Sequence, residues 1–497
     1  MVPLSIFSIN LLSDHLLLLT SVLIFVAILV TKLGTRFGAP SLLLFLILGM
    51  VAGADGIGLK FEDYEVAESI GHFAMTVILF TGGLETSFKE TRPVLKQGVL
   101  LSSLGVMLTV MLTGLFIWSV TPGMIGSIAT TLIGCFLLAA IMSSTDSASV
   151  FSVLRGKKLH LRENLGPLLE LESGSNDPMA YVLTIIMVQI LSSTKGMESG
   201  IWSQVLTGVW VLVLQIVIGA IIGIAVGYGA AWVLEKVNLS SSSLYSVLIL
   251  SIGFFSNGIA SVLDGNGLLS LYIAAIIIGN KVELKNRKEI ISFFNGMTWL
   301  MQLLMFLVLG LLARPSQMGT IILPALLICL FMMFIARPAS VFICLAPFRN
   351  MSVRAKFLVS WVGLKGAGPI LFALCPVVAG IEGASDIFNL VFCITLFSLI
   401  FQGMTLSKAA DFLKLSYDED PEVETFGMEL PEEMGMLRDH VVTRDELGEG
   451  ETMRDLNLPH GIRVVVVKRE EKFLVPHGSM PLKVGDHLLI MMGDSDD

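Results

Sequence analysis

The sequence predicts an all-α polytopic membrane protein with about thirteen transmembrane helices, followed by a small α/β or β-rich domain. Of its 497 residues, 54% are hydrophobic and only 15% are charged, which leaves too few polar residues to cover a soluble surface. Apolar runs that can cross a bilayer recur between charged or Gly/Pro-rich breaks. After Lys414 this pattern ends, and short β-rich runs alternate with turns.

The apolar runs, numbered here as spans 1 to 13, set the expected domain boundaries. They lie at about 14–33, 40–54, 66–83, 94–120, 124–153, 165–193, 204–234, 243–263, 267–280, 289–313, 318–346, 355–380 and 386–407. The β-rich runs lie at 462–467, 473–475 and 487–491. We therefore expect a transmembrane domain over residues 1–414, an acidic linker over 415–435 and a second domain over 436–497.

The loops predict an orientation in the membrane, because Lys and Arg accumulate in cytoplasmic loops. Nineteen of these residues lie on one alternating set of loops. The other set holds only three, Lys60, Lys195 and Arg314. We therefore expect the N-terminus outside and the C-terminal domain in the cytoplasm.

Composition argues against several kinds of partner and cofactor. The excess of acidic residues behind the net charge of −9 lies in residues 416–497, which will not attract nucleic acid or anionic lipid by charge. The five cysteines all lie in apolar runs without a Cys-x-x-Cys pair, which argues against a disulfide framework or a zinc site. We expect contact with membrane lipid, no nucleic-acid partner and no cofactor.

Spans 5 and 12 carry matching polar interruptions. Thirteen spans divide as six, one and six, which predicts two inverted repeats joined by span 7, and this pairing matches span 5 with span 12. Their interruptions, Ser143–Ser149 and Gly363–Pro369, predict broken helices of the kind that line transport sites. Packing of small residues between helices is the alternative, but it does not account for the charges of Asp146 and Lys365.

Span 6 carries two carboxylates at membrane depth, within Leu171–Pro178. An ionised side chain there costs at least ~2.5 kcal/mol, so Glu172 and Asp177 each need a partner, a proton or a cation. A serine helix cap followed by proline would explain the small polar residues but not the two acids. The span therefore predicts a site that binds and releases a cation.

Two other functional classes share some of these features. A potassium channel gated by its cytoplasmic domain would need a selectivity filter, and Ala225–Gly229 in span 7 is similar to one. That stretch lies in a continuous apolar run, where glycine at every fourth residue over 219–227 indicates helix packing. An intramembrane aspartyl protease would use Asp146 and Asp177, but the Asn-Asp-Pro context and the charge of Arg337 favour ion binding.

These motifs resemble those of the monovalent cation/proton antiporter superfamily, in its NhaP/NHE branch. The resemblance covers the membrane region from end to end, and the Asn-Asp pair of span 6 is its most specific signal. The matching motifs are Phe80–Glu85, Thr145–Asp146, Glu172–Pro178, Ala336–Pro338 and Gly363–Ala367.

The segment from Asp439 to about Asp494 resembles the TrkA-C (RCK-C) regulatory domain of potassium-transport systems. The resemblance rests on Gly448–Leu458, Lys468–Glu470 with Val475–Pro476, and Leu482–Asp486. The combination is similar to NhaP2-type bacterial potassium/proton antiporters. It implies a multi-pass protein of the cell inner (plasma) membrane and a homodimer. It also implies a small RCK-C-like cytoplasmic domain that regulates transport and binds a nucleotide or other small ligand.

The resemblance implies a secondary antiporter, not an enzyme, that exchanges cytoplasmic potassium for external protons by alternating access; sodium is the alternative cation. Asp177 is expected to bind proton and cation in competition. Oxygen atoms of Asn176, Ser173 and Thr145 are expected to complete the shell of a hard cation. Asp146 is either a further ligand or a charge that neutralises helix N-termini at the break.

The remaining charges are expected to be structural or accessory. Lys365 would neutralise the helix ends opposite Asp146. Arg337 is always protonated and needs an acidic partner, and the resemblance points to Glu172. Glu85 either helps ions to enter or lies at the cytoplasmic interface, near Lys89 in the sequence.

Overall fold

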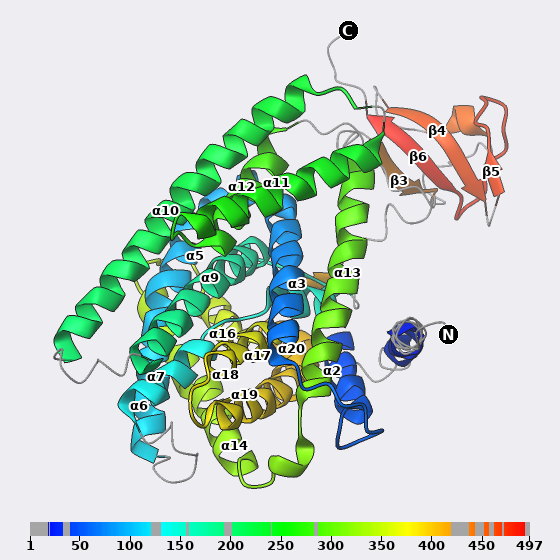
Figure 1. Ribbon diagram of the computed structural model, residues 1–497. Coiled ribbons are helices and arrows are strands. Elements are labelled where there is room, and N and C mark those ends of the chain that lie inside the picture. Colours follow the sequence, from blue (N-terminus) through cyan, green and yellow to red (C-terminus); the bar gives the residue numbers. More distant parts are fainter. Residues whose placement is uncertain are drawn as a thin grey trace, which may run out of the picture. The chain divides into compact units, whose positions relative to one another are not determined.

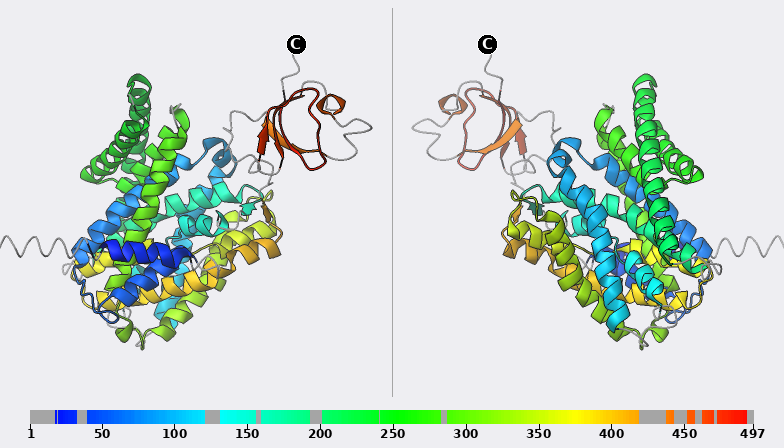
Figure 2. Two further views of the ribbon diagram at one scale, coloured as in Figure 1. Left: turned by 90° about the vertical axis from the view of Figure 1, so that its right-hand side faces the viewer. Right: turned by 90° about the vertical axis from the view of Figure 1, so that its left-hand side faces the viewer.

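The computed structural model describes residues 18, 20–32, 40–120, 131–155, 159–192, 201–239, 241–282, 287–418, 437–442, 452–456, 462–469 and 472–492. The chain divides into two compact units, Met1–Tyr417 and Asp418–Asp497. The first is a bundle of helices and the second is built on a small sheet (Figure 1 and Figure 2).

Helices make up most of the first unit. Its first half contains Thr20–Lys32, α2 (Ser41–Ala52), α3 (Tyr64–Glu85), α4 (Phe88–Thr91), η1 (Arg92–Val94), α5 (Leu95–Leu100), α6 (Val106–Val120), α7 (Leu132–Ile141), α8 (Ser147–Arg155), α9 (Leu165–Ser192) and α10 (Ile201–Lys236). Its second half contains α11 (Ser242–Val262), α12 (Gly267–Lys281), α13 (Arg287–Leu312), η5 (Pro315–Gln317), α14 (Ile322–Phe331), α15 (Arg337–Leu345), α16 (Val353–Trp361), α17 (Ala367–Phe372), α18 (Leu374–Val378), α19 (Ala384–Ser398) and α20 (Met404–Phe412).

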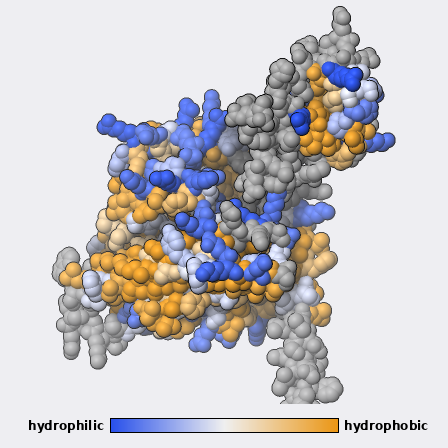
Figure 3. Space-filling model, turned by 90° about the horizontal axis from the view of Figure 1, so that it is seen from above, coloured by the Kyte–Doolittle hydropathy of each residue, from blue (hydrophilic) through white to orange (hydrophobic). Residues whose placement is uncertain are grey.

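Each span expected from the sequence contains at least one of these helices. Seven helical segments among the described residues are long and apolar enough to cross a membrane, judged by length and composition. Hydrophobic side chains cover wide areas of the face shown in Figure 3. Burying so much exposed apolar surface in lipid is favourable, as expected for a chain that spans a membrane.

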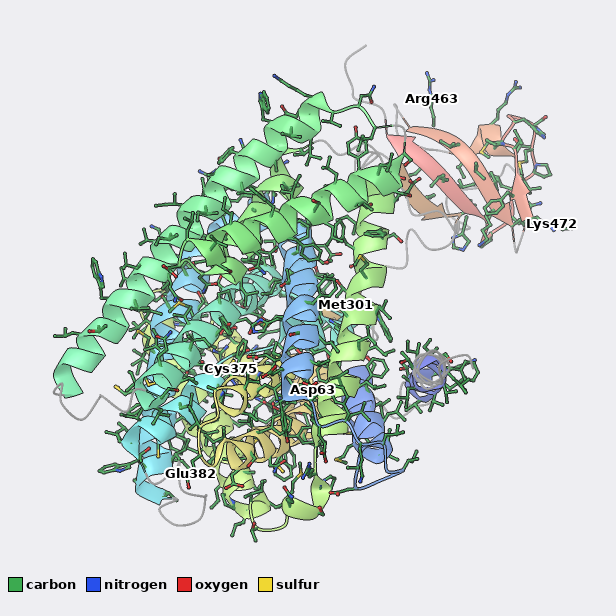
Figure 4. The ribbon with its side chains drawn as sticks, in the orientation of Figure 1. Asp63, Met301, Cys375, Glu382, Arg463 and Lys472 are labelled. Atoms are coloured by element: carbon green, nitrogen blue, oxygen red, sulfur yellow. The ribbon has the colours of Figure 1, made fainter. Side chains whose placement is uncertain are left out.

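Several helices begin at a short polar side chain that accepts a hydrogen bond from the first turn. These N-caps are Asp63 of α3, Thr131 of α7, Ser241 of α11, Asn266 of α12 and Ser352 of α16. Asp63, at the start of α3, is labelled in Figure 4. Such caps satisfy N–H groups that a helix cannot pair internally, and so fix where each helix starts.

Span 7 is one continuous helix, α10, and its glycines pack against α12. A Cβ atom added at Gly219 would lie 2.6 Å from the Asn266 carbonyl oxygen, and one at Gly227 would lie 2.9 Å from the Ile277 side chain. The helix-packing interpretation of these glycines is therefore confirmed. The resemblance of Ala225–Gly229 to a potassium filter is only one of sequence.

The interruptions of spans 5 and 12 are present. Residues 142–146 separate α7 from α8, and residues 362–366 separate α16 from α17. Three long helices also contain a π-helical turn, at Leu101–Gly105 (η2), Met332–Ala336 (η6) and Leu399–Gly403 (η7). Such turns are often found at functional sites, and η6 ends directly before Arg337.

The second unit contains a four-stranded antiparallel sheet in the order β3-β6-β4-β5. Its strands are β3 (Leu437–Val441), β4 (Ile462–Arg469), β5 (Lys472–Leu474) and β6 (His487–Met492), and η10 (Met453–Asp455) is a short 3-10 turn. The three β-rich runs of the sequence fall on β4, β5 and β6. Among the described residues of this unit, the buried hydrophobic core consists of Val442, Val467, Met480, Leu482, Leu488 and Ile490.

An ion pair ties strand β4 to the turn before β6. The Nε and Nη2 atoms of Arg469 lie 2.8 and 2.6 Å from the Asp486 carboxylate oxygens. Burial alone would raise the pKa of Asp486, but the hydrogen bonds from Arg469 and the Lys483 backbone outweigh it and hold that pKa below its usual value. Because the pKa is lowered on folding, the stabilisation is present at neutral pH and is lost as acid protonates the carboxylate.

A small sheet that the sequence did not reveal joins two distant parts of the first unit. Strand β1 (Leu159–Leu161) pairs with β2 (Ser416–Asp418), and the Arg162 N–H donates to the Leu415 carbonyl at 2.8 Å. The Leu415 side chain is only 3% exposed. Residues 415–418, expected to begin a linker, are thus held against the connection between α8 and α9.

This pairing predicts different stabilities for two truncated proteins. Truncation after Asp418 keeps β2 and Leu415, whereas truncation after Lys414 removes both. The shorter protein should lose about 2 kcal/mol of stability, the effect of burying one leucine side chain. Thermal unfolding in detergent measures the difference, and equal melting temperatures would contradict a stabilising role for β2.

Candidate ion-binding site

The two helix interruptions meet and bond to each other. The Asp146 N–H, in the first interruption, donates to the Leu364 carbonyl in the second at 2.9 Å. The Lys365 Nζ atom donates to the Ser144 carbonyl at 2.9 Å. These contacts define a crossing, formed by residues 142–146 and 362–366, which satisfies backbone groups that no helix pairs.

Helix α9 lies against the crossing and directs the side chains of Ser173 and Asn176 at Thr145. The Ser173 hydroxyl donates to the Thr145 carbonyl at 2.6 Å. The Asn176 amide accepts from the Thr145 N–H at 3.4 Å and donates to the Thr145 hydroxyl. The sequence-predicted residues Ser173, Asn176 and Thr145 are therefore neighbours, with Ser173 and Asn176 both hydrogen-bonded to Thr145.

Asp146 caps the helix that follows the interruption. Its carboxylate accepts from the Ser149 N–H at 3.1 Å and also from the Ser149 hydroxyl. A carboxylate at a helix N-terminus interacts favourably with the helix dipole, so this geometry favours the neutralising role over the ligand role. Lys365 interacts with the opposite kind of helix end. Its ammonium group binds the Ser144 carbonyl, which lies just after the C-terminus of α7.

Two glycines allow the crossing to close. A Cβ atom added at Gly366 would overlap the Asp146 carboxylate. One added at Gly368 would lie 2.9 Å from the Ser144 hydroxyl oxygen and 3.7 Å from an Asp177 carboxylate oxygen. Larger residues would push these polar groups apart.

Glu172 and Asp177, two of the acidic residues of α9, have different surroundings. Glu172 is only 1% exposed and its carboxylate lies 2.5 Å from the Arg337 guanidinium, so the expected pairing of these residues is present. Asp177 is partly exposed and accepts a hydrogen bond from the Ser144 hydroxyl. Of the two, Asp177 is the acid that is not paired with an arginine and keeps some exposed surface.

Three residues at the crossing were missed by sequence reasoning as functional residues. Ser144 contacts Asp177, as just described. The Ser398 hydroxyl accepts from the Lys365 N–H at 2.9 Å and donates to Gln402 at 2.6 Å, and Gln402 donates to the Trp361 carbonyl at 2.8 Å. Polar residues four apart in span 13 were the signal that could have pointed to this support of the second interruption.

A small cavity of about 20 Å³ lies behind the ion pair. Arg337, Lys365, Ser398 and Gln402 are among its lining residues. The Nε atom of Arg337 is buried and has no hydrogen-bond partner among the described residues. The cavity is large enough for about one water molecule, which would supply the missing acceptor.

Glu85 lies away from these contacts, at the end of α3. No hydrogen bond or ion pair joins it to the crossing within the described part of the chain. The next residue, Thr86, is bound through its carbonyl by Asn280 of α12 at 2.8 Å.

Comparison with protein families identifies the fold and the transporter class. Residues 21–410 match the transmembrane domain of sodium/hydrogen exchangers, and residues 440–496 match the TrkA-C domain. The chain belongs to the sodium/hydrogen exchanger family. It is therefore a multi-pass membrane cation/proton antiporter with a TrkA-C domain, a transporter rather than an enzyme.

Two named relatives of this exchanger cover almost all of the chain. The K(+)/H(+) antiporter NhaP2 of Shewanella sp. (strain ANA-3) is 36% identical over 95% of this chain and 80% of the relative. The K(+)/H(+) antiporter NhaP of Alkalimonas amylolytica is 33% identical over 97% and 81% of the respective chains. The solved sodium proton antiporter MjNhaP1 of Methanocaldococcus jannaschii has the same fold, with a TM-score of 0.66 at 20% identity over 82% of this chain and 99% of that one.

The buried ion pair of this exchanger predicts a stability defect. Arg337→Ala leaves Glu172 buried without a partner, which should lower the free energy of unfolding by about 3–5 kcal/mol. The control is Arg314→Ala, which breaks the 2.9 Å ion pair between Arg314 and Glu62. The two side chains are 35% and 60% exposed, so this change should lower the free energy of unfolding by only about 0–1 kcal/mol. Thermal unfolding in detergent compares the two; a stable Arg337→Ala protein with altered ion preference would place Arg337 in the transport path instead.

Proposed function

We propose that this antiporter exchanges cytoplasmic potassium for external protons by alternating access, with Asp177 binding proton and cation in competition. The observation that carries the proposal is the difference between the acids of α9. Glu172 is buried against Arg337, whereas Asp177 is partly exposed and contacts only a neutral hydroxyl in the hydrogen bonds described above. Asp177 is thus the carboxylate free to exchange its counter-charge.

The charges around the crossing support the same proposal. Glu172 and Arg337 neutralise each other, and Lys365 can offset only one of Asp146 and Asp177. One negative charge is left when all groups are ionised, and one proton or one monovalent cation balances it. Leaving it unbalanced at membrane depth is costly, so exchange of one for the other is favoured over an empty ionised site.

The proposed cation ligands are oxygen atoms of Asp177, Asn176, Ser173 and Thr145. These residues already contact one another or lie on adjacent turns of α9. Potassium and sodium both prefer such oxygen shells. Their donors and acceptors are hydrogen-bonded to one another, and a bound cation would take over the oxygen lone pairs. Asp146 acts in this proposal through the electrostatics of α8 rather than as a required ligand.

We propose potassium rather than sodium because the two relatives that cover most of the chain are both named K(+)/H(+) antiporters. A sodium/proton antiporter is the alternative. A channel gated by its TrkA-C domain is disfavoured because its filter candidate is part of the continuous helix α10.

The wider architecture belongs to the same proposal. We infer thirteen spans over residues 1–414 in two inverted repeats, with the N-terminus outside, in the cell inner membrane. The residues after the linker at 415–435 form a cytoplasmic domain over 436–497. Its small core supports pairing with its copy in a homodimer, and the cleft of such a pair suits a nucleotide or other small ligand. Glu85 is assigned to the cytoplasmic interface.

Replacing the proposed exchange carboxylate should abolish transport. Asp177→Asn cannot alternate between a proton and a cation, so exchange in proteoliposomes should fall to background while the protein inserts and folds. Collapse of an imposed pH gradient on addition of potassium or sodium is the measurement. Asp264→Asn is the matched control, because Asp264 is exposed, lies in a left-handed backbone conformation that Asn also tolerates, and should exchange normally. Proton-coupled transport by well-folded Asp177→Asn would refute the assignment.

Removing the second unit should alter control but not exchange. Truncation after Asp418 keeps β2 and removes the TrkA-C domain. The first unit, which we call the transport unit, then keeps both helix interruptions of the crossing. We expect exchange to persist while its dependence on cytoplasmic pH changes relative to the full chain. The pH profile of exchange in proteoliposomes measures this, and loss of all exchange from a correctly inserted truncated protein would make the domain part of the transport mechanism.

A further inference from the structure

We propose that Ser144 is a specificity-determining ligand residue of this antiporter: its hydroxyl, which donates to the Asp177 carboxylate, also coordinates a dehydrated alkali-metal cation held by that carboxylate. The inference rests on the proposed exchange at Asp177. It adds a residue whose side chain, unlike its neighbours in the same polar stretch, is directed at the exchanging carboxylate.

Two nearby hydroxyls, those of Ser143 and Ser173, donate to backbone carbonyls. Ser143 donates to the Ala140 carbonyl at 2.7 Å, and Ser173 donates to the Thr145 carbonyl at 2.6 Å. Ser144 instead donates to the Asp177 carboxylate, although it is only 1% exposed. Because the hydroxyl of this buried serine donates to the carboxylate rather than to a backbone carbonyl, we infer a role for it at the ion-binding site.

A hydroxyl group suits every state that an exchanging carboxylate must pass through. It carries one donor proton and two acceptor lone pairs, and the proton can rotate. It can therefore donate to ionised Asp177, accept from protonated Asp177, and turn a lone pair toward a cation held by Asp177. Alanine or valine can do none of these.

The backbone of Ser144 is fixed, so its hydroxyl has a defined position. The Lys365 ammonium group binds the Ser144 carbonyl at 2.9 Å. Gly368 of α17 lies on the other side, where a Cβ atom would be 2.9 Å from the hydroxyl oxygen. The hydroxyl thus faces a space whose width is set by a glycine. Because a ligand held at a fixed position discriminates between ions of different radius, we assign Ser144 a part in the choice between potassium and sodium.

The test compares Ser144→Thr with Ser144→Val, which have nearly the same shape and differ in the hydroxyl. Loss of one ligand should raise the half-saturating potassium concentration by about tenfold in Ser144→Val, while Ser144→Thr stays near wild type. The pH of half-maximal exchange should move to more alkaline values in Ser144→Val, because the ionised carboxylate loses a donor and protons compete better. The ratio of half-saturating sodium to potassium concentration should also change in that variant.

Thr184→Val is the control, since it removes a buried hydroxyl that donates to the Ala180 carbonyl at 2.8 Å within α9 and lies outside the crossing. It should leave the half-saturating concentration and the pH profile unchanged. The proposal would be overturned if Ser144→Thr and Ser144→Val had equal half-saturating potassium concentrations or equal pH values of half-maximal exchange. A wild-type protein without cation-coupled proton movement would instead refute the proposed function, so the two failures are distinguishable.

Discussion

The transport unit depends on the requirement that backbone groups released where helices break inside a membrane find partners within the protein. Here each interruption supplies partners for the other. Lys365 from the second binds the Ser144 carbonyl of the first, and Leu364 from the second accepts from the Asp146 N–H. The broken helices are consequently one structural element, and neither could be held in this form by local sequence alone.

Unequal burial then separates two chemically similar acids on a single helix. Glu172 and Asp177 are five positions apart in α9, so they leave the helix in different directions. One reaches Arg337, which follows the π-helical turn η6, and the other reaches the crossing. A buried ion pair gives little net stability, but it removes both charges from competition for ions. The proposed exchange at a single carboxylate, Asp177, depends on that removal.

Hydropathy and motif spacing predicted the helices, the two interruptions and the residues of α9, because these features repeat over long stretches or sit in dense polar clusters. The β1–β2 pairing was not predictable in this way. It joins three-residue strands more than two hundred positions apart, and so short a strand carries no periodic pattern. Ser398 and Gln402 were missed for a related reason: their spacing of four residues places two polar side chains on one face of span 13, but it does not say which other span that face supports.

The β1–β2 pairing also bears on how a signal from the TrkA-C domain can reach the ion site. The connection it holds, residues 159–164, runs from α8 with its Asp146 cap to the start of α9. Within the same connection, Glu163 accepts a hydrogen bond at 3.2 Å from the Ser352 N–H, at the start of α16, the helix that leads into the second interruption. A displacement of β2 would therefore act on both broken helices and on α9 together. A ligand of the second unit can shift transport only if it binds two arrangements of the chain with different affinity.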